Sequence, residues 1–110
     1  MITLDVLRST VFDANGEARI TIFPDRARDV WKIWRYVVNT TSLGQTRCFV
    51  YRGSEQTGAH IDFTRTGNND VSENVRDTEI DFGRPLIFVW TGGDVGAEAS
   101  VSILGEVIKR

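Results

Sequence analysis

The chain has little of the chemistry that most redox and cofactor sites require. Its 110 residues include one cysteine, Cys48, and one histidine, His60. A single cysteine excludes an internal disulfide and any metal or redox motif built on two cysteines. The sequence also has no P-loop, no dinucleotide-binding fingerprint and no cluster of cysteine and histidine, so we expect no cofactor.

Long apolar runs and an excess of basic charge are also missing. No run reaches the length of about 20 apolar residues that a membrane helix needs, and the first residues alternate between apolar and polar types instead of forming a signal peptide. The 13 basic and 15 acidic residues give a formal charge of −2, with no basic stripe to follow a phosphate backbone. We therefore expect neither a membrane nor a nucleic acid as partner.

What the chain does contain is a series of short segments in which apolar and polar residues alternate. Its 41% hydrophobic and 25% charged residues are ordinary for a globular protein, and the length predicts one domain over residues 1–110. Seven to nine strands at a spacing of roughly ten residues, with turn residues between them, predict an all-β fold. The expected architecture is a single antiparallel β-sandwich of jelly-roll type.

Two β-hairpins are predicted from turn chemistry. Asn15 and Gly16 form the strongest short hairpin signal, so residues 2–12 are expected to pair with residues 18–22. Glycines at 92, 93 and 96, with Asp94 as a turn residue, are expected to fold residues 86–91 back on residues 97–103. In this second hairpin alternation places the large side chains of one arm opposite small ones of the other: Leu86, Phe88 and Trp90 opposite Ala97, Ala99, Val101 and Ile103.

Residues 28–41 fit two structures. Apolar residues at 30, 33, 34, 37 and 38 have helical spacing, but the segment is dense in β-branched and aromatic residues, which favour a strand. We predict a long strand and keep a helix over residues 28–38 as the alternative. In a regular strand Trp34 and Tyr36 would share one face and Trp31 would lie on the other. The chain end, residues 105–110, is expected at a sheet edge or against a neighbouring subunit.

Catalytic groups are sparse. Alternation over residues 59–64 places Ala59, Ile61 and Phe63 on the core side and the remaining three outward: His60, Asp62 and Thr64. A solvated surface histidine is favoured over a catalytic pair of His60 with Asp62, and Cys48 in its apolar strand is predicted to be a small hydrophobic residue. The acids between residues 62 and 81 have no spacing that fixes a glycosidase pair, so we predict that the protein is not an enzyme.

Two ligand types have candidate residues. Asn68, Asn69 and Asp70, with nearby Asp62 or Asp81, offer oxygen ligands for calcium. The loop lacks the full calcium-loop pattern and is also good turn chemistry, so turn residues are favoured over a metal site at Asn68 and Asp70. Three tryptophans and two tyrosines are compatible with sugar stacking, although large aromatics in a small domain usually form the core.

Three sequence blocks resemble small structural proteins of tailed bacteriophages that infect actinobacteria. The blocks are VWKI at residues 30–33, CFVYRG at 48–53 followed by TRTGNND at 64–70, and WTGGDVGA at 90–97. The resemblance spans roughly residues 16–105, its last block is the most specific part, and it transfers no active-site residue. It implies a virion component, made in the host cytoplasm, that acts as a capsid decoration (cement) protein or as a module of a head or tail fibre.

These implications define the functional hypotheses. The first is a non-enzymatic decoration protein that stabilises the shell by binding the major capsid protein or other virion proteins, as a homo-oligomer and most simply a trimer. The second is a carbohydrate-binding adhesin module of a fibre or tail tip that holds a host glycan, and a small carbohydrate-active enzyme ranks below both. Residues 1–12 are expected to be an arm or edge strand used in assembly, with residues 107–110 as the other contact segment. The predicted partner contacts are Ile2, Leu4, Val6, Trp31, Asn68, Asn69 and Asp70.

Overall fold

The computed structural model describes residues 2–109, and Met1 and Arg110 lie outside the described residues. The described part contains strands but no α-helix, which confirms the all-β prediction and the strand interpretation of residues 28–38. One short 3-10 helix, η1 (Thr57–Ala59), precedes β5. The strands are β1 (Ile2–Val11), β2 (Ala18–Ile22), β3 (Asp29–Thr40), β4 (Arg47–Arg52), β5 (His60–Thr64), β6 (Asp70–Ser72), β7 (Thr78–Ile80), β8 (Leu86–Thr91) and β9 (Glu98–Lys109).

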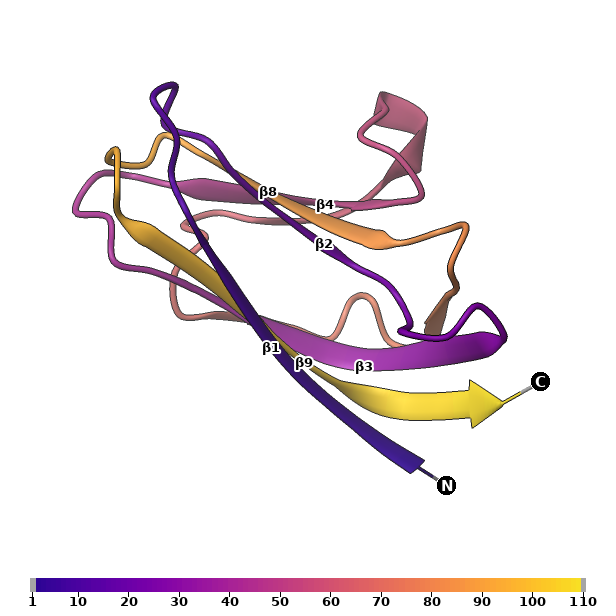
Figure 1. Cartoon of the computed structure of the whole chain (residues 1–110). Helices are drawn as coiled ribbons and strands as arrows, with labels where there is room; N and C mark the ends of the chain where they lie inside the picture. Colours follow the sequence, from indigo (N-terminus) through magenta and orange to yellow (C-terminus); the bar gives the residue numbers. More distant parts are fainter. Residues whose placement is uncertain (1, 110) are drawn as a thin grey trace.

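The strands form two antiparallel sheets that pack face to face (Figure 1). Sheet A has the order β1-β9-β3-β6, with β7 also paired to β3, and sheet B has the order β2-β8-β4-β5. Pairing is nested, since β1 pairs with β9, β2 with β8, β3 with β6, and β4 with β5. This nesting is the order of a jelly roll, to which β7 is an addition.

Both predicted hairpins are wrong in their pairing, although their turn residues are right. Residues 13–16 form a tight turn in which the Asp13 carbonyl accepts a hydrogen bond from Gly16 N–H at 3.0 Å, and Gly16 has a φ of 73°. The strands on either side of this turn then enter different sheets, as do β8 and β9. The two corners bond to each other instead, because Gly93 N–H donates to the Gly16 carbonyl at 3.0 Å.

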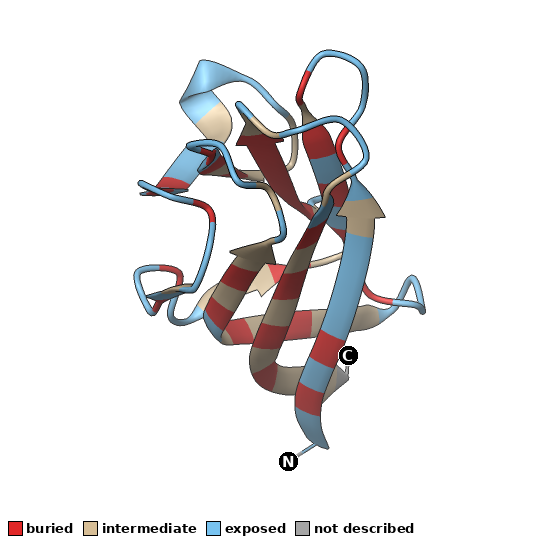
Figure 2. Ribbon diagram, turned by 90° about the vertical axis from the view of Figure 1, so that its left-hand side faces the viewer, coloured by how far each residue is buried: buried red, intermediate tan, exposed pale blue. Residues whose placement is uncertain are grey.

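The core lies between the sheets, and the predicted faces of β8 and β9 are confirmed. Buried and more exposed residues alternate along the long strands (Figure 2). Phe88 and Trp90 point inward from sheet B, and Val101 and Ile103 point inward from sheet A. Because β8 and β9 belong to opposite sheets, their large and small side chains meet across the core and not along a ladder.

A β-bulge overturns the expected faces of β3. The β3–β9 register shifts between Ile33 and Arg35, so Trp34 is an extra residue without a paired position on β9. An extra residue reverses the alternation beyond it. Trp31 and Tyr36 therefore both face the core, while Trp34 is half-buried on the outside.

The predicted faces of β5 are also inverted. Asp62 and Thr64 are buried, whereas Ile61 and Phe63 are exposed. The physical reason is that Asp62 finds four hydrogen-bond donors inside the sandwich, while Phe63 packs on Phe49 on the outer face of sheet B, with ring centroids 5.1 Å apart. A register shift opposite Val50 and Tyr51 places His60 on that outer face as well.

One polar segment contains strands, and one further expectation is corrected. The long polar stretch 66–79 contains β6 and the start of β7, both paired with β3. The chain end was expected at a sheet edge, but β9 is a central strand of sheet A, between β1 and β3. The edge position of sheet A belongs to β1, as the arm-or-edge prediction allowed.

Candidate functional site

Several predicted contact residues point into the sandwich. Leu4 and Val6 belong to the core, and Trp31 is only 5% exposed. A partner that docks on the folded domain therefore cannot reach more than a small part of these three side chains. Ile2, at the end of β1, is exposed.

Cys48 and His60 lie apart from any catalytic arrangement in the described part of the chain. Cys48 is fully buried, and burial, reinforced by the charge of Asp62, raises the pKa of its thiol. A thiol of this kind is a poor nucleophile, which agrees with its interpretation as a small hydrophobic residue. His60 lies on the outer face of sheet B and Asp62 on the inner face, so the two do not form the pair that their spacing offered.

Asp62 is the centre of a buried polar network that joins the two sheets. Its carboxylate accepts hydrogen bonds from the hydroxyls of Tyr36 and Ser72, each at 2.6 Å. Asn74 Nδ2 donates at 3.2 Å and the Phe63 N–H at 2.9 Å. Because β5 lies in sheet B whereas β3 and β6 lie in sheet A, the carboxylate ties the layers together. We call Asp62, Tyr36, Ser72 and Asn74 the Asp62 network.

The pKa values in this network identify it as structural. Burial alone would raise the pKa of Asp62, but the hydrogen bonds from Ser72, Tyr36, Phe63 N–H and Asn74 outweigh burial and lower it. Burial, followed by the bond to Asp62, raises the pKa of Tyr36. At neutral pH the carboxylate is therefore ionised and the phenol protonated, the state in which the hydrogen bonds hold the network together.

The lowered pKa of Asp62 predicts acid sensitivity. A folded-state pKa below the unfolded value of about 3.9 means that the contribution of Asp62 to stability is fully present above that value and is lost as pH falls through the folded pKa. We expect the free energy of unfolding of the native chain to fall more steeply below about pH 5 than that of Asp62→Asn. Urea unfolding from neutral to acidic pH measures this difference, with Asp25→Asn at an exposed site as control. Parallel pH curves for the native chain and Asp62→Asn would contradict it.

The asparagine and aspartate groups proposed for calcium are engaged in turn hydrogen bonds. Asn68 Oδ1 accepts from Thr40 N–H at 3.2 Å, and an Asp70 oxygen accepts from the Thr66 N–H at 3.2 Å. Asn69 N–H donates to Asn39 Oδ1, and the Asn69 φ of 53° is typical of a turn. Among residues 2–109 no group of three or more acidic, histidine or cysteine side chains is placed to hold a metal ion.

The loops at this end of the sandwich hold one another in place. Asp94 accepts a hydrogen bond from Leu43 N–H at 2.9 Å, and this bond, with that to Ser42, lowers the pKa of Asp94. Trp90 Nε1 donates to the Gly67 carbonyl at 3.0 Å. A Cβ at Gly67 would lie 2.8 Å from the Trp90 ring, and its φ is 59°, so this close approach requires glycine.

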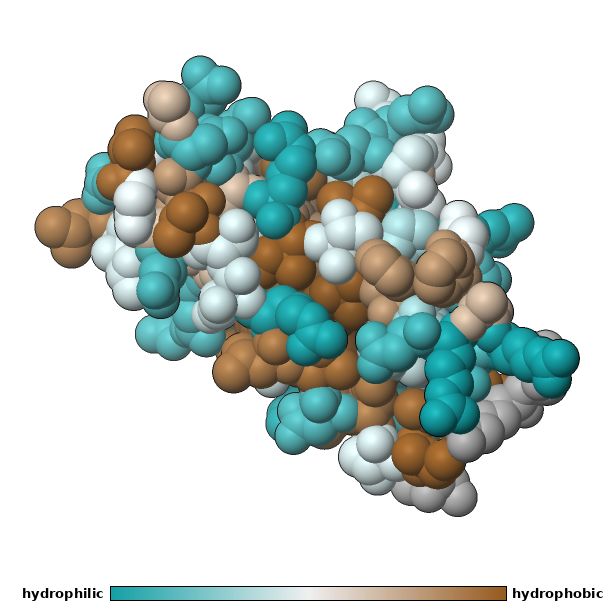
Figure 3. Space-filling view, in the orientation of Figure 1, coloured by the Kyte–Doolittle hydropathy of each residue, from teal (hydrophilic) through white to brown (hydrophobic). Residues whose placement is uncertain are grey.

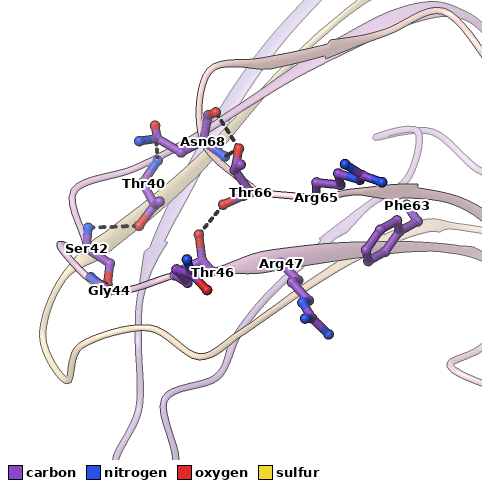
Figure 4. A pocket seen from close by; sticks show the side chains of 10 residues that line it. Thr40, Ser42, Gly44, Thr46, Arg47, Phe63, Arg65, Thr66 and Asn68 are labelled. Carbon is purple, nitrogen blue, oxygen red and sulfur yellow. Dashed lines mark hydrogen bonds between the residues drawn. The ribbon is translucent and has the colours of Figure 1, made fainter.

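Between these loops lies a groove of about 650 Å³, where β4 begins and β5 ends (Figure 4). Its walls carry hydroxyl, amide, guanidinium and aromatic groups, and no acidic residue is among the described residues that line it. The lining side chains are Thr40, Ser42, Thr46, Thr66, Gln45, Asn68, Arg47, Arg65 and Phe63, with Gly44. The Thr46 hydroxyl donates to the Thr66 carbonyl and fixes one wall to the other. This groove is the candidate functional site.

Comparisons with known proteins do not place the chain in a family. No family model matches it, and no curated protein or solved structure is significantly similar to it. Within residues 2–109, no helix has the length and hydropathy to cross a bilayer. The functional argument therefore rests on the fold and on the surface chemistry.

Sequence reasoning found Asn68 in this groove but missed Arg47, Phe63 and Arg65. A signal was present, because Arg47 and Phe49 are two residues apart at the start of one strand, and Phe63 and Arg65 are two apart at the end of the next. Residues two apart in a strand share a face. Assigning Phe63 to the core concealed this pattern.

A second surface with apolar character lies on the outer face of sheet A. The register aligns Leu7, Ser102, Val37 and Val71 side by side across four strands. Leu7 is 67% exposed and Val71 60% exposed, and Val37 is half-buried. We call these four residues the Leu7 row.

Proposed function

We propose that the chain is a non-enzymatic structural component of a tailed-phage virion, specifically a capsid decoration protein that stabilises the shell. The resemblance of its three sequence blocks to phage structural proteins supports this role. The jelly-roll order of the strands adds a fold-level analogy, because that fold recurs in viral capsid proteins, although folds alone do not determine function.

The observation that carries the proposal is the surface at β1. This ten-residue strand forms one edge of sheet A, and no described strand pairs with its outer side. Soluble proteins usually shorten, charge or cover such edges. β1 carries the exposed charged residues Asp5 and Arg8, but its outward side chains also include exposed Leu7 and Val11, and hydrophobic surface lies along the centre of the side that β1 and β2 border (Figure 3).

An edge with adjacent apolar side chains is suited to assembly. A partner strand can add to the unpaired backbone groups, or copies of the chain can close a symmetric ring. In this proposal the partners are the major capsid protein and further copies of the chain, arranged as a trimer, and the mature location is the virion. The Leu7 row extends the contact from the edge over the face of sheet A.

The test replaces Leu7 by lysine, since deletion of β1 would also remove core residues Leu4 and Val6. We expect Leu7→Lys to lose incorporation into phage particles by at least about tenfold, because a charge on an apolar contact is costly to bury. The matched control, Thr21→Lys, places the same charge at an exposed position of the edge strand β2 and should incorporate normally. Quantitative mass spectrometry of purified particles gives copy number.

Two outcomes would count against the proposal. Absence of the native chain from purified particles would refute a virion role altogether. Normal incorporation of Leu7→Lys would keep the virion role but refute β1 as the assembly surface. Thermal unfolding of both variants checks that the fold is intact.

A further inference from the structure

The outer face of sheet B carries a strip of aromatic side chains on its last two strands. Phe49 pairs with Phe63, and Tyr51 pairs with His60, across the β4–β5 ladder. The Phe49 and Phe63 ring centroids are 5.1 Å apart, and those of Tyr51 and His60 are 5.4 Å apart. Phe63 is 40% exposed, although the sequence assigned it to the core. We call these four residues the aromatic strip.

Two arginines lie at the end of this strip. Arg47 precedes and Arg65 follows the Cys48–Thr64 pair, so the two residues lie one position beyond the end of the β4–β5 ladder. Like charges that oppose each other across a ladder destabilise a sheet. Among the described residues neither guanidinium has an ion pair or a hydrogen bond, unlike Arg19, which pairs with Glu55 at 3.0 Å. The Arg47 and Arg65 pair therefore lacks an anion that would neutralise it.

The groove described above supplies the remaining chemistry next to the arginines. Figure 4 shows Arg65 above and Arg47 below, both between the Phe63 ring and the polar loop residues, with their side chains extending in opposite directions in this view. The hydroxyls and amides of this wall both donate and accept hydrogen bonds. A ligand in the groove would thus meet an aromatic surface, two positive charges and a set of polar groups that can bind hydroxyls.

We infer that this groove binds an acidic saccharide, with the sugar ring on Phe63 and its carboxylate or phosphate held by Arg47 and Arg65. Guanidinium groups bind both anions in bidentate geometry, and the apolar face of a pyranose packs on an aromatic ring. The wall with Ser42 and Asn68 hydrogen-bonds the sugar hydroxyls. This site is separate from the assembly surface, because its arginines and its aromatic ring lie on or beside β4 and β5 of sheet B, whereas the assembly surface is β1 and the outer face of sheet A.

The charge distribution favours a saccharide over a nucleic acid. A strand of nucleic acid is bound through many phosphate contacts, whereas this groove offers two arginines and the whole chain has a formal charge of −2. Arg19 also lies on the outer face of sheet B, but its charge is already neutralised by Glu55 and Glu17. Two arginines are enough to hold one acidic group beside a sugar ring.

The inference is tested by titration with four soluble probes, followed by amide chemical shifts and calorimetry. The probes are tetragalacturonate, a phosphodiester-linked N-acetylglucosamine oligomer, neutral chitotetraose and a short oligothymidylate. We expect at least one acidic saccharide to bind about tenfold more tightly than chitotetraose, with shifts at residues 46–47 and 63–66. The two acidic probes distinguish carboxylate from phosphate as the recognised anion.

Variants then assign the contacts. Combined Arg47→Gln and Arg65→Gln should abolish the preference for the acidic probe, whereas Arg35→Gln, the same change at an exposed site on sheet A, should keep it. Phe63→Leu should weaken the binding of acidic and neutral saccharides alike. Equal binding of acidic and neutral probes, tighter binding of the oligothymidylate, or an unchanged preference in the double variant would each overturn the inference. All positions are exposed, and unchanged thermal unfolding verifies folding.

Discussion

Replacing Asp62 by alanine is expected to lower the free energy of unfolding by about 2–6 kcal/mol, because each of two buried donors left without an acceptor costs about 1–3 kcal/mol. The carboxylate is 8% exposed and accepts four hydrogen bonds, so its loss leaves the hydroxyls of Tyr36 and Ser72 without their acceptor inside the sandwich. Buried donors without partners keep their full desolvation cost. The substitution also removes the side-chain link that the Asp62 network forms between β5 in sheet B and the strands β3 and β6 in sheet A.

Urea unfolding at neutral pH measures this effect, and two further variants calibrate it. Tyr36→Phe removes one donor to a charged group and should cost about 1.5–3 kcal/mol. Asp25→Ala removes an exposed carboxylate that has no hydrogen bond in the described part of the chain, and it should change stability by less than about 0.5 kcal/mol. A cost for Asp62→Ala no larger than that for Asp25→Ala would show that the network does not stabilise the fold.

Gly105→Ala is expected to cost at least about 3 kcal/mol or to prevent folding, the upper end of the range for overpacking. A Cβ at Gly105 would lie 2.2 Å from the Lys32 carbonyl oxygen and 3.2 Å from Ile33 Cα. Both atoms belong to the backbone of β3, which cannot give way as a flexible side chain can. The clash falls in the centre of sheet A, beside the bulge at Trp34.

Gly58→Ala is the matched control for Gly105→Ala. It makes the same change in η1, where no atom of the described chain outside the adjoining residues lies within 4 Å of the added carbon. Its effect should stay within about 0.5 kcal/mol. Denaturant midpoints of the two variants give the comparison, and similar stability for Gly105→Ala and Gly58→Ala would refute the steric argument.

The sequence was sufficient to predict the inward faces of β8 and β9 but not their strand partners. Alternation places Phe88 and Val101 in the core, and the structure confirms both. Turn residues at 13–16 and 92–96 correctly marked two reversals of the chain. A reversal does not specify whether the next strand continues in the same sheet, and in the nested order of a jelly roll it enters the opposite one.

The errors at β3 and β5 have local causes. The bulge at Trp34 reverses the alternation halfway along β3, and a single extra residue leaves no distinct mark in the sequence. On β5 the usual rule of apolar residues inside fails, because Asp62 is satisfied by donors from β3 and β6, which are distant in sequence. Such a network becomes visible only once the strands are placed.

The candidate site was only partly predictable for the same reason. Asn68 was singled out as a turn residue, and it does line the groove. Arg47 and Arg65 are 18 positions apart, and only the antiparallel pairing of β4 with β5 brings them together. If Phe63 had been assigned to the outward face, the alternation would have placed both arginines on that same face.

The central position of β9 also determines when the domain can form during synthesis. Sheet A cannot close until residues 98–109 have left the ribosome, because β9 separates β1 from β3. Until then the inward side chains of β1, which is made before β9, have no ladder to hold them over the core. Long-range pairing of this kind folds slowly and leaves strand edges available to other chains. The nascent protein is therefore most vulnerable to aggregation just before its last strand is made.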